Sequence, residues 1–126
     1  MENKIKYTSQ KIVRECDTAQ SAGSGNLPVF ATPMMVALME NAAMKAAEQL
    51  LQEGESTVGS ELNIKHLRPT AIGEEVSATA VLTAQEGRKL TFSVVATDKN
   101  GTIGEGTHVR YIINAEKFMS KEQTRS

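Results

Sequence analysis

The chain has few of the residues that mark secreted, membrane or nucleic-acid-binding proteins. Its 126 residues include one cysteine, Cys16, and no tryptophan, and the formal net charge is −1. A single cysteine excludes an internal disulfide framework and fits a reducing compartment. The absence of a long basic run disfavours nucleic acid as a partner. No apolar run reaches transmembrane length and the start lacks a signal-peptide core, so we expect a cytoplasmic protein without membrane contact.

What the chain does contain is an ordered series of apolar patterns. Residues 4–14 alternate weakly between polar and apolar side chains, which predicts a half-exposed strand. Residues 17–28 are rich in serine and glycine, which predicts a loop that is either disordered or a lid over a site. Almost every position from Met34 to Leu51 is apolar or alanine, which predicts a long helix, buried on several sides, that ends at Gly54.

Four antiparallel strands are expected after the helix, with turns at Glu86-Gly87 and Asn100-Gly101. A single curved sheet of five strands can wrap one apolar helix, which defines an α+β domain. We therefore expect one domain over residues 1–126, in which residues 115–126 are a charged tail that frays or forms a short helix. In the strand after the helix, one face is expected to carry Val58, Ser60, Leu62, Ile64 and His66.

Three residues in this framework have side chains that can act as nucleophile, base and orienting acid. Thr32, followed by Pro33, is expected to be the N-cap of the helix, and a lone threonine there is most often only a cap. Glu40 is a carboxylate inside the apolar stretch, where an unpaired charge is costly. His66 shares the apolar face of its strand, where a lone histidine is usually a satisfied core residue. A hydroxyl, an imidazole and a carboxylate together form a hydrolytic relay, which favours catalysis.

The remaining candidates are weaker on their own. Eight helical residues separate Thr32 from Glu40, about 12 Å along the axis, so an imidazole from the same or a partner subunit would have to bridge them. Gly59 in mid-strand indicates a bulge or a close approach of a ligand, and its N–H could serve as an oxyanion donor. Arg110 is either a solvated strand residue or a guanidinium for an acyl carbonyl, and His108 on the same face is expected to be structural or supporting. No cysteine–histidine cluster has zinc-ligand spacing, so no metal is expected.

A resemblance to a known family is carried by Val29-Phe30-Ala31-Thr32, Met35-Val36, Leu38-Met39-Glu40, Gly59, His66, Gly104-Glu105-Gly106-Thr107-His108-Val109-Arg110 and Glu116-Lys117-Phe118. With these residues the chain resembles the fluoroacetyl-coenzyme A thioesterase family of the hot-dog fold, a curved five-stranded antiparallel sheet around one long central helix. The resemblance implies that Thr32, Glu40 and His66 are catalytic. It also implies that Gly59 and Arg110 contact the acyl thioester.

The function implied by this resemblance is hydrolysis of a short acyl-coenzyme A thioester, with no cofactor besides the coenzyme A of the substrate. One alternative is a non-catalytic acyl-coenzyme A binding module on the same scaffold. Another is a hydratase, which would need an Asp/His pair in a hydration loop that the sequence does not show. The family's namesake has bulky aromatic residues in a lid before the helix and residues 22–27 have none, so broader acyl tolerance is expected. A lone five-stranded sheet leaves an edge uncovered, so we expect a homodimer paired through sheet edges with the site near the boundary.

Overall fold

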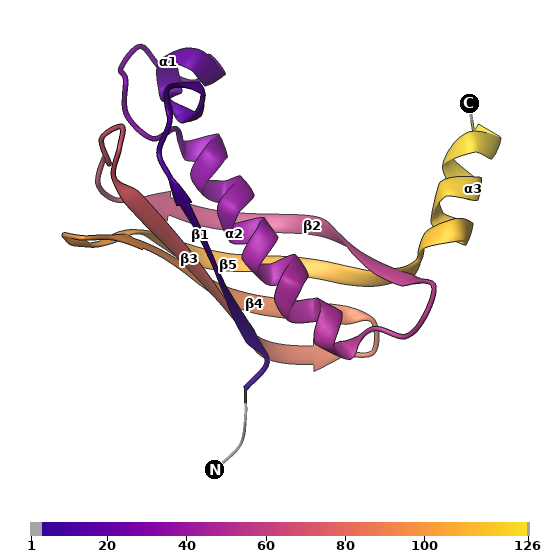
Figure 1. Ribbon diagram of the computed structural model, residues 1–126. Helices are drawn as coiled ribbons and strands as arrows, with labels where there is room; N and C mark the ends of the chain where they lie inside the picture. The colour runs from indigo at the N-terminus through magenta and orange to yellow at the C-terminus, as the bar shows by residue number, and fades with distance from the viewer. Residues whose placement is uncertain (1–3, 126) are drawn as a thin grey trace.

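The five strands form one antiparallel sheet that curves around a long helix (Figure 1). The structure is a computed structural model that describes residues 4–125 of the chain. The strand order is β1-β3-β4-β5-β2, so β1 and β2 are the edge strands. The α+β architecture and the predicted order of elements are confirmed. In chain order the elements are β1 (Lys6–Ile12), η1 (Glu15–Asp17), α1 (Ala19–Ala22), α2 (Thr32–Ala47), η2 (Glu48–Leu50), β2 (Glu55–His66), β3 (Glu75–Glu86), β4 (Lys89–Asp98), β5 (Gly101–Asn114) and α3 (Ala115–Arg125).

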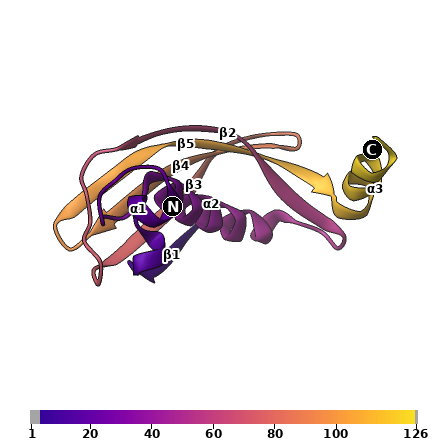
Figure 2. The same cartoon turned by 90° about the horizontal axis from the view of Figure 1, so that it is seen from above.

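Helix α2 lies across the concave side of the sheet, against β1, β3 and β4 (Figure 2). Met35 and Met39 of α2 are fully buried and share one apolar core with Phe92 of β4. Each such side chain contributes roughly 1.5–3 kcal/mol when it is buried. Further buried positions of α2 are Ala42, Ala43, Ala46 and Ala47. Their short side chains let the second half of the helix lie close to the sheet, so the core sets where the polar residues of α2 stand.

The start of α2 differs from the sequence prediction. Ala31 is the N-cap and Thr32 is the first helical residue, so the prediction that Thr32 caps the helix is wrong. The Ala31 N–H donates to the backbone oxygen of Asp17 at 2.9 Å, and the Ala31 oxygen accepts from Met34 and Met35. This fixed backbone begins the helix without a side-chain cap. The Thr32 hydroxyl is therefore available to a partner outside α2.

The segment predicted as a loop, residues 17–28, contains the single-turn helix α1. Thr18 begins this turn, because its hydroxyl accepts a hydrogen bond from the Ser21 N–H at 3.2 Å. Asp17 is buried and ties the segment to β1 through Lys11, whose Nζ lies 2.6 Å from its carboxylate. The serine and glycine content of this segment predicted a loop and did not indicate these hydrogen bonds. They hold the segment beside the first turn of α2.

A β-bulge in β2 changes which residues face the helix. The pairing of β2 with β5 shifts between Gly59 and Glu61, so Ser60 is the extra residue. Beyond the bulge Leu62 and His66 pair with residues on the helix side of β5, whereas Val58 pairs with Tyr111 on the opposite side. The prediction that Val58 shares a face with Leu62 and His66 is therefore wrong, because one inserted residue reverses the alternation. Gly59 lies on the helix side instead.

The β4–β5 hairpin and the C-terminal tail match the sequence prediction in outline. The β4–β5 hairpin closes through Lys99 and Asn100, one residue before the predicted pair, because Asp98 pairs with Gly101. The C-terminal tail forms α3, which extends away from the sheet in Figure 1 and is one of the two forms expected. Within residues 4–125 no helix is long and apolar enough to span a membrane.

Candidate active site

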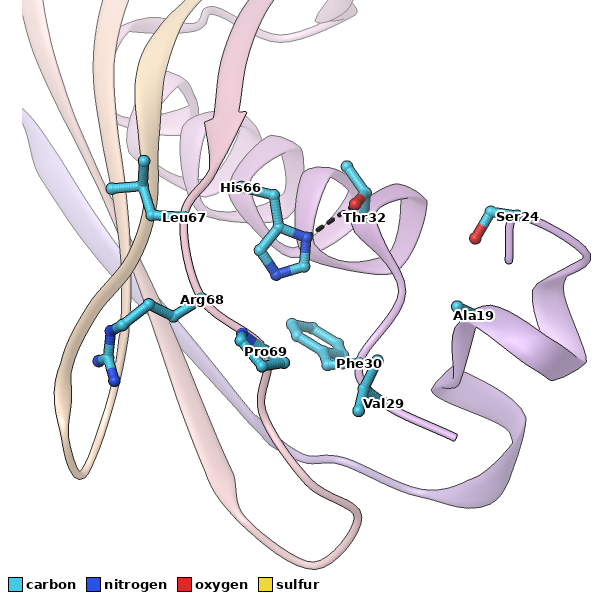
Figure 3. A pocket seen from close by; sticks show the side chains of 9 residues that line it. All are labelled: Ala19, Ser24, Val29, Phe30, Thr32, His66, Leu67, Arg68 and Pro69. Carbon is cyan, nitrogen blue, oxygen red and sulfur yellow. Dashed lines mark hydrogen bonds between the residues drawn. The ribbon is translucent and has the colours of Figure 1, made fainter. Parts of the chain in front are cut away.

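Thr32 and His66 meet at the N-terminal end of α2 (Figure 3). The Thr32 Oγ1 lies 2.7 Å from Nδ1 of His66. Thr32 is exposed at the first residue of α2, and His66 is half-buried at the last residue of β2. The N-terminal end of a helix favours negative charge, so an oxyanion that develops beside Thr32 would be stabilised there. The structure thus brings together two of the three residues expected to be catalytic.

The surroundings of His66 suit a proton acceptor. Burial lowers the pKa of His66 below its ordinary value, and the backbone of Arg68 opposes this shift only in part. The ring is therefore neutral near pH 7, and Nδ1 can accept the Thr32 proton. In that arrangement Nε2 carries the ring hydrogen. The Nε2 atom is buried and has no hydrogen-bond partner in the described part of the chain.

A pocket of about 280 Å³ opens beside this pair. Its apolar wall includes Val29, Phe30, Leu67 and Pro69, and Ser24 lies across from them in Figure 3. Ser24 belongs to the segment for which a lid was one of the two expectations, whereas Val29, Phe30, Leu67 and Pro69 were not predicted as residues that line a site. The available signal for these four residues was their position in the chain, within three residues of Thr32 or His66.

Asp98 anchors the segment that follows His66. Its carboxylate accepts a hydrogen bond from the Thr70 hydroxyl at 2.8 Å and lies 3.5 Å from Nη2 of Arg68. Burial raises the pKa of Asp98, but hydrogen bonds from the Asn100 N–H and from Thr70 outweigh it, so the pKa lies below its ordinary value. Asp98 is therefore ionised at neutral pH. The Arg68 side chain is held on this carboxylate rather than on the imidazole.

The other expected site residues, Glu40, Gly59 and Arg110, form a second group together with His108, here called the arginine cluster. A Cβ on Gly59 would lie 3.0 Å from Glu40 Oε2, 3.1 Å from His108 Cε1 and 3.4 Å from Arg110 Nη1. Any larger residue at this position would force these side chains to shift by a few tenths of an ångström. The predicted bulge is present at Ser60, directly after Gly59. The groups that approach Gly59 closely are the protein's own side chains, and the approach of a ligand there stays a prediction.

Arg110 is buried, and each of its three guanidinium nitrogen atoms has a hydrogen-bond partner. Its Nε donates to Thr57 Oγ1 at 2.8 Å and its Nη2 donates to the Thr57 backbone oxygen at 3.0 Å. Burial lowers the pKa of Arg110 and the nearby charge of Glu40 opposes that shift. The alternative of a solvated strand residue is therefore wrong. Glu40 itself is half-buried, and its carboxylate makes no hydrogen bond or ion pair with the side chains that the structure describes.

Within one chain the two groups stay apart. Glu40 stands beside Gly59, and His66 lies seven residues further along β2. At about 3.3 Å per strand residue, and allowing for the bulge, this is a separation of about 20 Å. The hydroxyl and the imidazole are thus in contact, while Glu40 stands with the arginine cluster. Among residues 4–125, no three His, Cys, Asp or Glu side chains lie together as metal ligands would.

The architecture and this site define the class of the protein. A curved antiparallel sheet around one long helix, with a hydroxyl–imidazole pair at the helix N-terminus, is that of a hot-dog-fold thioesterase. The family model described as fluoroacetyl-CoA-specific thioesterase matches residues 13–116. The chain therefore belongs to this family, as the sequence resemblance indicated.

Individual relatives agree with this assignment. The fluoroacetyl-CoA thioesterase of Streptantibioticus cattleyicolor is 43% identical over 93 residues, which are 74% of this chain and 67% of that protein. A solved structure of a fluoroacetyl-CoA thioesterase matches with a TM-score of 0.91 at 34% identity, over 100% of this chain and 98% of that one. A thioesterase superfamily member from Thermus thermophilus matches with a TM-score of 0.87 at 27% identity, over 98% of this chain and 94% of that one.

Proposed function

We propose that the protein hydrolyses a short acyl-coenzyme A thioester to the free acid and coenzyme A, with Thr32 and His66 at the reacting carbonyl. Membership of a thioesterase family gives the reaction class. The observation that carries the site is the 2.7 Å contact between Thr32 Oγ1 and His66 Nδ1, beside a pocket. The volume of this pocket is about 280 Å³. Small-molecule pockets span roughly 300–1,000 Å³, so a short acyl group suits it best.

The pair supplies a base and an oxygen nucleophile. Nδ1 of His66 takes the Thr32 proton while the threonine oxygen attacks the thioester carbonyl. If a water molecule held by Thr32 attacks instead, its proton passes to the threonine oxygen as the threonine proton passes to Nδ1. The carbon–sulfur bond then breaks, and His66 returns the proton to the coenzyme A sulfur. If Thr32 is the nucleophile, a water molecule activated by His66 releases the acid from the acyl-threonine. Coenzyme A enters only as part of the substrate.

Glu40 enters this scheme from a second copy of the chain. Strand β2 is an edge strand, and its residues 60–63 are exposed. A two-fold axis near Leu62 would lie three residues from Gly59 and four from His66. Antiparallel pairing about such an axis places the arginine cluster of each subunit beside His66 of the partner subunit. Glu40 would then orient that imidazole and stabilise its charged form, while Gly59 and Arg110 bind the acyl carbonyl.

Release of free thiol from a panel of acyl-coenzyme A thioesters tests the reaction. We expect hydrolysis of acetyl and propionyl thioesters as well as fluoroacetyl, because the segment 22–27 has no aromatic side chain to seal the pocket. An apolar wall discriminates by only about 1–3 kcal/mol per methylene. Binding without thiol release would instead identify a non-catalytic module, and a strong fluoroacetyl preference would contradict the open pocket.

Complementation tests whether the site is shared between subunits. Glu40→Gln and His66→Ala should each lose activity as homodimers. A mixed dimer of the two variants contains one site with both substitutions and one site with neither, so it should regain the turnover of one intact site. A mixed dimer of exposed Lys65→Ala with His66→Ala also contains one intact site, so its turnover is the reference value for the comparison. If all residues of a site came from one chain, the mixed dimer would stay inactive.

A further inference from the structure

His108 is a fully buried imidazole on the side of β5 that faces α2. Its Nδ1 lies 2.9 Å from the backbone oxygen of Glu61. A carbonyl oxygen only accepts, so Nδ1 carries the ring proton. Its Nε2 lies 3.1 Å from Nη1 of Arg110. A guanidinium only donates, so Nε2 holds a lone pair and His108 is a neutral imidazole in one tautomer.

Arg110 depends on this acceptor at one end of its planar group. Two of its nitrogen atoms, Nε and Nη2, donate to Thr57. The third, Nη1, donates to His108. Nη1 is also the atom of Arg110 closest to the position of a Gly59 Cβ, at 3.4 Å, and Glu40 Oε2 lies 3.0 Å from the same position. His108 therefore holds the end of the guanidinium that stands nearest to Gly59.

We propose that His108 is a positioning residue for the thioesterase reaction: it accepts a hydrogen bond from Nη1 and so fixes the plane in which Arg110 presents its remaining N–H groups to the acyl carbonyl. This inference rests on the proposed function, in which Arg110 and Glu40 serve the reacting thioester. His108 itself neither touches the substrate nor transfers a proton, because both of its ring nitrogens are engaged.

The charge balance of the cluster fits a neutral acceptor. Burial lowers the pKa of His108, and the shift remains downward although the Glu61 backbone and Glu40 oppose it. The guanidinium of Arg110 acts in the same direction as burial. A protonated ring would lose its acceptor atom and would repel the guanidinium.

Two substitutions separate the two hydrogen bonds of the ring. In His108→Asn the amide nitrogen takes the place of Nδ1 and keeps the bond to Glu61, but the acceptor for Arg110 is lost. In His108→Gln the amide oxygen takes the place of Nε2 and keeps the acceptor for Arg110. We expect kcat to fall roughly 10- to 100-fold in His108→Asn, the range for loss of a hydrogen bond to a charged group, and by a smaller factor in His108→Gln.

Steady-state kinetics and thermal unfolding of both variants decide between positioning and mere packing. A higher kcat in His108→Gln than in His108→Asn, when the two variants have similar melting temperatures, supports the positioning role. Equal losses of kcat, or activity that simply follows stability, would overturn it. If the unsubstituted protein releases no thiol, it is the proposed function that fails. If the unsubstituted protein is active and the two variants have equal kcat values, only the positioning role of His108 fails.

A second test uses the unsubstituted protein, so its result does not depend on whether the variants fold. Nitrogen-15 spectra of the imidazoles distinguish a protonated Nδ1 from a protonated Nε2. We expect His108 to show a protonated Nδ1, unchanged from pH 8 to the pH at which His66 titrates. A protonated Nε2, or titration of His108 together with His66, would contradict the hydrogen-bond assignment on which the positioning role depends.

Discussion

The two histidines lie on the same side of the sheet, yet their ring nitrogens have different partners. Nδ1 of His66 meets the Thr32 hydroxyl, and its Nε2 has no partner among the described residues. Both nitrogens of His108 are engaged, one by a backbone oxygen and the other by Arg110. Burial lowers the pKa of both rings. The pKa alone therefore does not identify the base; a hydroxyl partner does, because only that bond lets the ring accept a proton.

Removal of the His66 imidazole should have the largest effect. General-base assistance is typically worth about 10²–10⁴-fold in rate, so kcat of His66→Ala should fall by about this factor while the protein stays folded. Thiol release and circular dichroism measure the two quantities. Lys65→Ala, at the exposed neighbouring position of β2, is the matched control and should keep its turnover. Wild-type turnover in His66→Ala would refute its role as base.

Thr32 should matter for rate and little for stability. Thr32→Ala should lose more turnover than Thr32→Ser, which keeps the hydroxyl that contacts His66. A capping threonine would cost about 1 kcal/mol on substitution by alanine, whereas Thr32 makes no side-chain cap to α2. The free energy of unfolding in urea should therefore change by clearly less than this. Unchanged turnover in Thr32→Ala, beside an inactive His66→Ala, would identify water or Glu40 as the attacking group.

Gly59→Ala tests the arginine cluster with a smaller change. The added methyl would lie 3.0 Å from Glu40 Oε2 and 3.1 Å from His108 Cε1, so the carboxylate must shift by a few tenths of an ångström. A misplacement of 1 Å can cost about 100-fold, and we expect a loss of kcat well below that. Ser56→Ala, elsewhere on β2, is the control. Full activity of Gly59→Ala would show that the position of Glu40 is not critical.

The pH dependence should show the smallest effect. Because the folded pKa of His66 is depressed, the base is lost only when the pH falls through a value below the ordinary 6.5. The acid limb of kcat/KM should therefore have its midpoint below pH 6.5, and His108→Gln should leave that limb in place. Since both folded histidines have depressed pKa values, unfolded chains bind more protons below about pH 6.5. The free energy of unfolding should therefore decrease as the pH falls through that range. An acid limb of kcat/KM with its midpoint at or above pH 6.5 would contradict the assignment of His66 as the base.

Much of the fold was predictable because its signals are local. The long run of apolar residues and alanines predicted α2, and alternation predicted the strands of the sheet. The errors arose where one residue changes the geometry. Ser60 adds a bulge that moves Val58 to the opposite face, and a bond from Ala31 to Asp17 starts α2 one residue before the expected position. Neither effect has a periodic pattern, because each depends on a partner far away in the chain.

The sequence by itself determined the fold class and the family, and it predicted which residues form the candidate site. The tertiary structure decided how those residues are grouped. It places Thr32 against His66 and holds Glu40 with Gly59, His108 and Arg110. The physical reason is that β2 is an extended strand, so Gly59 and His66, seven positions apart on its helix side, lie about 20 Å apart. His66 stands beside Thr32 at the first residue of α2, and Gly59 stands beside Glu40 in the middle of that helix. Residue spacing shows which side chains share a face, and only the packed chain shows which of them come within bonding distance.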